Sequence, residues 1–121
     1  GPMTLEEYDE GIRGYASELG ITVEIFHSNL EGEVMNKFYE SHEGDIDAAI
    51  INPALYTTGY PGLVAAIRQV RFPTIEVHMS NPATRGGASQ IATVCHGVIT
   101  GFGIFGYYLG LKAAVHLSEK N

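Results

Sequence analysis

The sequence has little positive charge, a single cysteine and no tryptophan. Its 7 Lys and Arg residues stand against 14 Asp and Glu residues, so the formal net charge is -7. This balance, with no basic cluster, argues against a nucleic-acid partner, because phosphate recognition needs a concentrated basic surface. Cys95, the one cysteine, excludes an intrachain disulfide and suits a reducing cytoplasm.

Long apolar runs are also missing. No stretch is long enough to span a bilayer and no signal-peptide pattern opens the chain, so we expect no membrane association. The composition is otherwise that of a globular protein, 45% hydrophobic and 17% charged. Gly1 and Pro2, ahead of Met3, have the form of a remnant left by cleavage of a tag. We therefore expect one cytoplasmic domain over residues 3–121.

The hydrophobic pattern alternates between helical and strand periodicity. Thr4 and Glu7 have the spacing of a capping box and predict a helix that ends near Leu19, before Gly20. Further helices are expected at residues 32–42, 62–70 and 104–118, and strands at residues 21–26, 48–52, 74–78 and 97–101. This alternation predicts an α/β sandwich with a parallel sheet. The chain opens with a helix, so no strand precedes the first crossover.

The strongest candidate site follows the apolar strand at residues 74–78. Ligands in an open parallel sheet lie beyond the carboxyl ends of the strands, where this strand presents Glu76 and His78. The two side chains are two residues apart and therefore share a face. A carboxylate beside an imidazole can hold its tautomer and stabilise the imidazolium, which predicts an acid–base pair. The alternative is a satisfied polar pair that closes the strand.

Other polar groups fall at similar positions. Asn52 ends the strand at residues 48–52, although an Asn-Pro pair also begins many turns. Backbone N–H groups of Met79, Ser80 and Asn81 are suited to an anion nest that would hold a carboxylate. Arg85 is the nearby basic residue, which either clamps the anion or faces solvent.

No cofactor or metal is expected. Residues 101–106 match GxGxxG, but the chain ends with the helix that follows, so the glycines are better explained by a tight turn and close packing of helix on sheet. The remaining histidines lack metal-ligand spacing; they are His27, His42, His96 and His116.

Four ordered motifs, at residues 26–33, 51–57, 73–81 and 97–103, resemble the type II dehydroquinase family. The first, F-H-S-N-L-E-G-E, is similar to the family's F-Q-S-N-x-E-G-E. The resemblance implies a flavodoxin-like three-layer sandwich with a parallel sheet, and an anti elimination of water through an enolate. It also implies a role for each matching residue. His78 protonates the leaving hydroxyl with Glu76 behind it, Asn52 holds the enolate through a water, and the amides of Met79 and Ser80 take the substrate carboxylate.

The sequence also departs from the family pattern. The family's first strand, an Asn-containing loop and a lid with a base tyrosine and an arginine have no counterpart here. Thr58 stands where the family has a substrate-binding His, and Val64-Ala65 replaces an Arg-Asp pair. A shortened loop leaves Arg85 in place of two arginines. Without the first strand we expect four strands per chain, with residues 22–26 pairing directly with residues 48–52 or with another chain.

These departures shape the expected function. We predict a divergent lyase or isomerase that acts on a small alicyclic or hydroxy carboxylic acid, with Tyr56 or Tyr60 as the substitute base and Thr58 in the substrate pocket. One alternative is a non-catalytic relative that binds a ligand or a partner. Another is a true 3-dehydroquinate dehydratase whose first strand and lid precede residue 1. We expect a homo-oligomer, built on trimers or by strand swapping.

Overall fold

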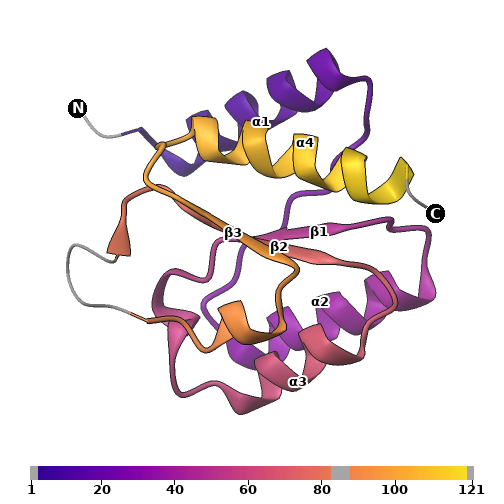
Figure 1. The fold of residues 1–121 in the computed structure, drawn as a ribbon, viewed down its shortest axis with the longest axis vertical. Helices are drawn as coiled ribbons and strands as arrows, with labels where there is room; N and C mark the ends of the chain where they lie inside the picture. The colour runs from indigo at the N-terminus through magenta and orange to yellow at the C-terminus, as the bar shows by residue number, and fades with distance from the viewer. Residues whose placement is uncertain (1–2, 83–87, 120–121) are drawn as a thin grey trace.

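The computed structural model describes residues 3–82 and 88–119 and contains four helices and a three-stranded sheet there (Figure 1). In chain order the main elements are α1 (Leu5–Leu19), α2 (Glu31–Glu43), β1 (Ala49–Ile51), α3 (Pro61–Gln69), β2 (Thr74–His78), β3 (Gly97–Thr100) and α4 (Phe105–Glu119). Short 3-10 helices, η1 (Ala54–Thr57) and η3 (Ile91–Val94), lie in two of the connections.

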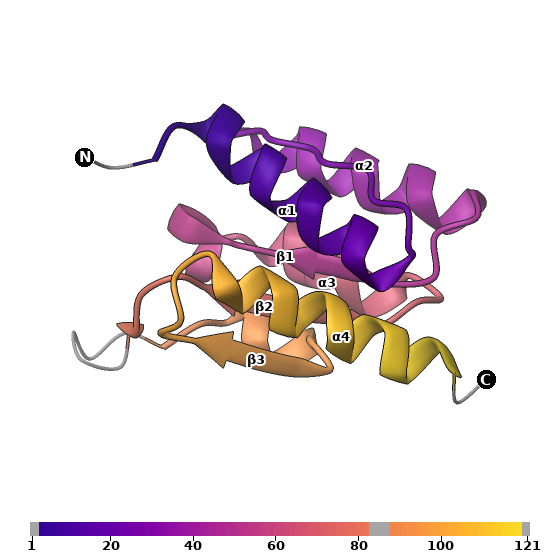
Figure 2. The ribbon, with the colours of Figure 1, turned by 90° about the horizontal axis from the view of Figure 1, so that it is seen from above.

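The elements form three layers. Helices α1 and α4 cover one face of the sheet, and α2 and α3 cover the other (Figures 1 and 2). The strand order is β1-β2-β3, and both pairs are parallel. The predicted α/β sandwich with a parallel sheet is therefore confirmed. No helix in the described part of the chain is long and apolar enough to cross a membrane.

The predicted strand at residues 21–26 is wrong, and the sheet has three strands rather than four. The segment keeps the alternation of a strand: Ile21, Val23 and Ile25 are half-buried, and the residues between them are exposed. Among the described residues, however, no backbone hydrogen bond joins residues 22–27 to β1. The pattern predicted the local conformation correctly, but a strand also requires a hydrogen-bonded partner.

The start of α1 follows the sequence closely. Thr4 Oγ1 accepts from the Glu7 backbone N–H at 3.1 Å, and Glu7 Oε1 accepts from the Thr4 N–H at 2.9 Å. This reciprocal cap is worth about 1 kcal/mol of helix stability. Gly20 ends the helix with φ 70°, a left-handed conformation that favours glycine.

Two apolar clusters hold the layers together. The larger lies between the sheet and α2 and α3, and its buried members include Phe38, Ile51, Leu63, Phe72 and Ile91. The smaller lies under α1 and α4, around Ile12, Ala16 and Leu111. Strand β2 lies between the two clusters, and all five of its residues are buried.

The glycines at residues 101–106, after β3, allow a tight turn and close packing of α4 on the sheet. Gly101 and Gly103 have φ values of 95° and 58°. A Cβ atom on Gly106 would lie 3.2 Å from a methyl carbon of Val77, so α4 approaches β2 closely at this point. The structure thus agrees with the interpretation of these glycines made from the sequence.

Candidate active site

The Glu76–His78 pair lies at the carboxyl end of β2, the central strand. His78 Nε2 is 2.5 Å from Glu76 Oε2. Glu76 is 1% exposed and His78 is 9% exposed. A buried carboxylate needs hydrogen-bond partners to offset the loss of water, and His78 supplies the first. The imidazole retains a small exposed fraction, and proton exchange with a ligand would have to take place there.

Ser89 supplies the second partner, and sequence reasoning missed it. Its hydroxyl donates to Glu76 Oε1 at 3.0 Å and accepts from the Ala92 N–H at 3.4 Å. Both carboxylate oxygens of Glu76 are therefore engaged, one by His78 and one by Ser89. The only local signal was a Ser-Gln pair just ahead of the buried Ile91, which does not point to Glu76.

Gln90 ties the neighbouring loop to this segment. Its backbone N–H donates to the Thr57 carbonyl at 2.7 Å, and its side-chain Oε1 accepts from the Gly59 N–H at 3.0 Å. Thr58 lies between these two anchors, exposed, directly after η1. The loop of the predicted substrate residue Thr58 is thus fixed against the segment that supports Glu76.

Asn52 lies just beyond β1 and is held on both sides of its amide. Its Nδ2 donates to Tyr107 Oη at 3.1 Å, and its Oδ1 accepts from the Ala54 N–H at 3.3 Å. Tyr107 belongs to α4, so the side chain of Asn52 points to the face of the sheet that α4 covers. Glu76 pairs in register with Ile51, which faces α2 and α3. Asn52 and His78 therefore reach the same edge of the sheet from opposite faces.

Ala54 adds local strain beside Asn52. Its φ of 48° is unusual for a residue with a Cβ atom. The hydrogen bond from its N–H to Asn52 helps to hold that conformation. Strained backbone of this kind is frequent near functional sites.

Tyr56 occupies a packed position in η1. Its hydroxyl donates to the Ser28 carbonyl at 3.1 Å, and its ring contacts the Tyr60 ring edge to face. Burial, reinforced by Tyr60 and the carboxylates of Glu33 and Glu31, raises the pKa of Tyr56. The phenolate is therefore scarce at neutral pH, which argues against Tyr56 as the base. A catalytic role for Tyr56 remains a prediction.

The remaining predicted residues lie around the turn after β2. The carbonyls of His78 and Met79 accept from the Gly101 and Gly103 N–H groups at 3.2 and 2.8 Å, which joins this turn to the one after β3. Ser80 and Asn81 are exposed at the same edge. Arg85 lies outside the described residues.

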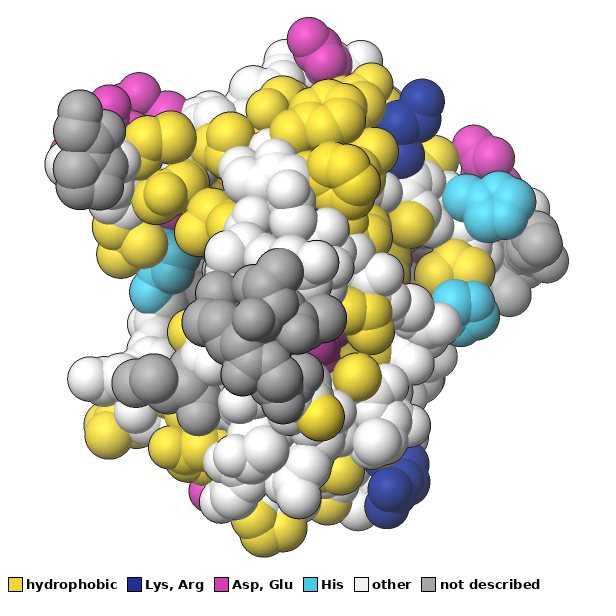
Figure 3. Space-filling model, turned by 60° about the vertical axis from the view of Figure 1, so that its left-hand side comes forward, with side chains coloured by type: hydrophobic (Ala, Val, Ile, Leu, Met, Phe, Trp, Pro, Cys, Tyr) yellow, Lys and Arg dark blue, Asp and Glu magenta, His cyan; other side chains and the backbone are white. Residues whose placement is uncertain are grey.

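Hydrophobic side chains gather over α1 and α4 on the face that Figure 3 shows. Between α1 and α4, the rings of Tyr15 and Phe105 each contact Tyr108. Within residues 3–82 and 88–119, no group of three or more His, Cys, Asp or Glu side chains is arranged to hold a metal.

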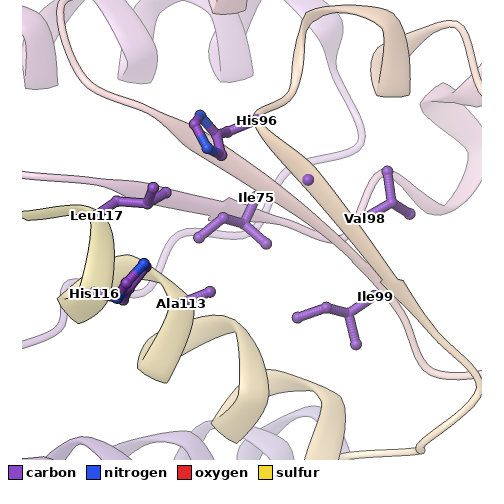
Figure 4. A pocket seen from close by; sticks show the side chains of 8 residues that line it. Ile75, His96, Val98, Ile99, Ala113, His116 and Leu117 are labelled. Atoms are coloured by element: carbon purple, nitrogen blue, oxygen red, sulfur yellow. The ribbon is translucent and has the colours of Figure 1, made fainter.

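A shallow, open pocket of about 290 Å³ lies at the opposite end of the sheet (Figure 4). It is lined mainly by apolar groups of β3 and α4, such as Ile99 and Leu117. Its polar side chains are His96 and His116. Because β3 begins there, this pocket is separate from the edge that carries His78.

Comparison with known proteins identifies the family. Residues 1–115 match the family described as dehydroquinase class II. A curated relative, the 3-dehydroquinate dehydratase of a Nitratiruptor species, is 47% identical over 116 residues, 93% of this chain and 74% of the relative. The corresponding protein of a Sulfurovum species is 44% identical over 92% of this chain and 70% of its own length.

The fold agrees with solved structures of the same kind. The type II dehydroquinase from Butyrivibrio crossotus superposes with a TM-score of 0.90 at 30% identity, over 95% of this chain and 82% of that one. The type II dehydroquinase from Propionibacterium acnes gives a TM-score of 0.84 at 29% identity, over 96% and 79% of the two chains. The resemblance found in four short motifs extends through the whole fold, and the chain belongs to the class II dehydroquinase family.

Proposed function

We propose that this protein is a hydro-lyase that removes water from 3-dehydroquinate. The observation that carries the proposal is the buried Glu76–His78 pair at the carboxyl end of the central strand, in a chain of this family. Relatives between 39% and 47% identical to it bear the name 3-dehydroquinate dehydratase. This supports the ordinary family activity over the altered chemistry that the departures in sequence suggested.

In the proposed reaction a base takes the proton next to the ketone and an enolate forms. The carbon–oxygen bond then breaks as the carbon–carbon double bond forms, and the leaving hydroxyl takes a proton from His78 to depart as water. Glu76 keeps the imidazole oriented and stabilises its protonated form, and Ser89 holds the carboxylate in place.

We assign the remaining groups to binding. The amides of Met79 and Ser80 would hold the substrate carboxylate, since a turn at the end of a strand can direct N–H groups at an anion. Asn52 would position the enolate oxygen with the amide hydrogen that Tyr107 leaves available. The described residues thus supply the acid half of the reaction, and we assign the base to none of them.

The oligomeric state and the cellular location of the protein remain proposals. We propose a homo-oligomer, which light scattering of the purified protein would test. We also propose a cytoplasmic protein, on the ground of its single cysteine. The names of the relatives do not support the alternative of a non-catalytic binding protein.

The test is an ultraviolet assay for the conjugated enone product, with calorimetry of quinate binding on the same sample. Product formation that scales with protein concentration supports the proposal. Binding of quinate without any product would overturn it in favour of a carboxylate-binding relative.

A further inference from the structure

Two neighbouring residues, Ser89 and Gln90, attach one short segment to two different parts of the edge that carries His78. The Ser89 hydroxyl donates to the Glu76 carboxylate. Gln90 instead contacts the loop that follows β1, through the carbonyl of residue 57 and the N–H of residue 59. The proposed reaction gives a role to Ser89 but none to Gln90.

The backbone of Gln90 is held firmly by its neighbours along the chain. Gln90 is the residue at the N-terminal cap of η3. Its carbonyl accepts from the Thr93 hydroxyl at 2.6 Å and from the Thr93 N–H at 3.2 Å. Ile91, the next residue, is buried in the cluster between the sheet and the helices α2 and α3. The side chain of Gln90 therefore reaches the loop from a fixed position.

Thr58 lies between the two points at which Gln90 contacts the loop. Its backbone is extended, with φ -140° and ψ 149°. Gly59 follows with φ 85°, a left-handed conformation that favours glycine, and its N–H donates to Gln90 Oε1 at 3.0 Å. The carbonyl just before Thr58 accepts from the Gln90 N–H at 2.7 Å. Because both flanking peptide groups are bonded to Gln90, the backbone of Thr58 is restricted to one conformation.

The side chain of Thr58 is available to a ligand. The residue is exposed, and no hydrogen bond of its hydroxyl is found among residues 3–82 and 88–119. Its loop follows β1, and His78 ends β2. Since these strands are parallel neighbours, their carboxyl ends lie at the same edge of the sheet. A hydroxyl at this edge can donate to, or accept from, the hydroxyl groups and the carboxylate of 3-dehydroquinate.

We propose that Gln90 is a positioning residue that sets the affinity for substrate through Thr58. It holds the backbone on both sides of Thr58, so the hydroxyl is already oriented when the substrate binds. Within the described chain, the hydrogen bonds found for Gln90 go to residues 57, 59 and 93 and not to Glu76 or His78. Its effect is therefore on binding and not on proton transfer. The inference rests on the proposed function, because it takes the substrate of that reaction as the ligand of Thr58.

Gln90→Met tests the assignment, because methionine has a similar length but replaces the amide oxygen with a weak acceptor. KM for 3-dehydroquinate should rise about three- to tenfold, as expected for the loss of one hydrogen bond, while kcat stays within about twofold. Thr93→Val is the matched control. It removes a hydrogen bond to the Gln90 carbonyl within η3 but keeps the side chain of Gln90, so KM should stay within about twofold. Equal increases in KM in the two variants, or a fall in kcat that exceeds the rise in KM, would overturn the proposal.

A double-mutant cycle with Thr58→Val tests whether Gln90 acts through Thr58. Valine keeps the branched shape and suits the extended backbone, but it lacks the hydroxyl. In the Thr58→Val background, Gln90→Met should raise KM by less than about twofold, because the group that Gln90 positions is already absent. Additive effects of the two substitutions would overturn the proposal.

The unaltered protein separates this inference from the proposed function. If it forms no enone, the proposed function fails, and the dissociation constant of quinate, measured by calorimetry, takes the place of KM in the same cycle. A rise of about three- to tenfold for Gln90→Met that disappears in the Thr58→Val background then supports the positioning role. An unchanged affinity for quinate in Gln90→Met, or no binding of quinate by the unaltered protein, would overturn it.

Discussion

His78 Nε2 lies 2.5 Å from Glu76 Oε2, and this contact lies at the end of a strand on which every residue is buried. The geometry fixes Nε2 as the imidazole nitrogen that meets the carboxylate, so a proton given to the substrate would come from Nδ1. Its consequences for rate and for stability can be measured separately.

The carboxylate of Glu76 is expected to matter through its charge. Glu76→Gln keeps the shape of the side chain but removes the negative charge that stabilises the imidazolium, so kcat should fall by about a hundredfold with little change in KM. Ser89→Ala, which removes only a neutral partner of the same carboxylate, should reduce kcat by much less. Equal losses in the two variants would contradict the assignment of charge stabilisation to Glu76.

Tyr107 is expected to hold the amide of Asn52. Tyr107→Phe leaves a partly buried N–H without its partner and should lower the free energy of unfolding by about 1 to 3 kcal/mol. Tyr108→Phe is the matched control, since Tyr108 interacts through its ring with Phe105 and Tyr15. Chemical denaturation measures both variants, and similar values for the two would count against the hydrogen bond.

Cys95 is expected to be unreactive in the folded protein. Burial, and then the nearby charge of Glu76, raises the pKa of the Cys95 thiol from 9.0 to about 12. Alkylation by iodoacetamide at pH 8 should therefore be at least about a hundredfold slower than in the unfolded chain. Mass spectrometry of timed samples gives both rates.

The same shift predicts a loss of stability in alkali. The folded state holds the Cys95 proton more tightly than the unfolded state, so its contribution is complete below pH 9 and is lost as the pH rises toward about 12. Cys95→Ala should flatten the fall of the melting temperature across that window. An unchanged slope would show that other groups, such as Tyr107 with its raised pKa, account for the loss.

An Ala→Gly substitution usually lowers the free energy of unfolding, but the strained backbone at Ala54 predicts an increase there. Ala54→Gly relieves a left-handed conformation and should raise the free energy of unfolding by about 1 kcal/mol. Ala65→Gly, within α3, should lower it by about 0.5 to 1 kcal/mol. Denaturant titrations of the two variants should therefore move in opposite directions.

Local features were predictable from the sequence. The capping box of Thr4 and Glu7 spans three residues, and both of its hydrogen bonds form. The apolar stretch at residues 74–78 predicted β2 with its correct bounds, and the two-residue spacing predicted that Glu76 and His78 share a face. Each of these rests on periodicity or on neighbours along the chain.

Long-range features were not predictable. Ser89 meets Glu76 across 13 positions and Tyr107 meets Asn52 across 55, and no local pattern links either pair. The segment of residues 21–26 has the composition of a strand, but pairing depends on a partner elsewhere in the fold, and the described chain provides none.

The central claim is that this chain dehydrates 3-dehydroquinate with His78 as the proton donor. The most direct measurement is the initial rate of enone formation by the unaltered protein, His78→Ala and His96→Ala, each checked for folding by circular dichroism. His96 is the matched control, because it lies at the other end of the sheet. We predict that His78→Ala loses about two to four orders of magnitude in rate while His96→Ala keeps it. A folded His78→Ala protein that turns over substrate as fast as the unaltered one would contradict the claim.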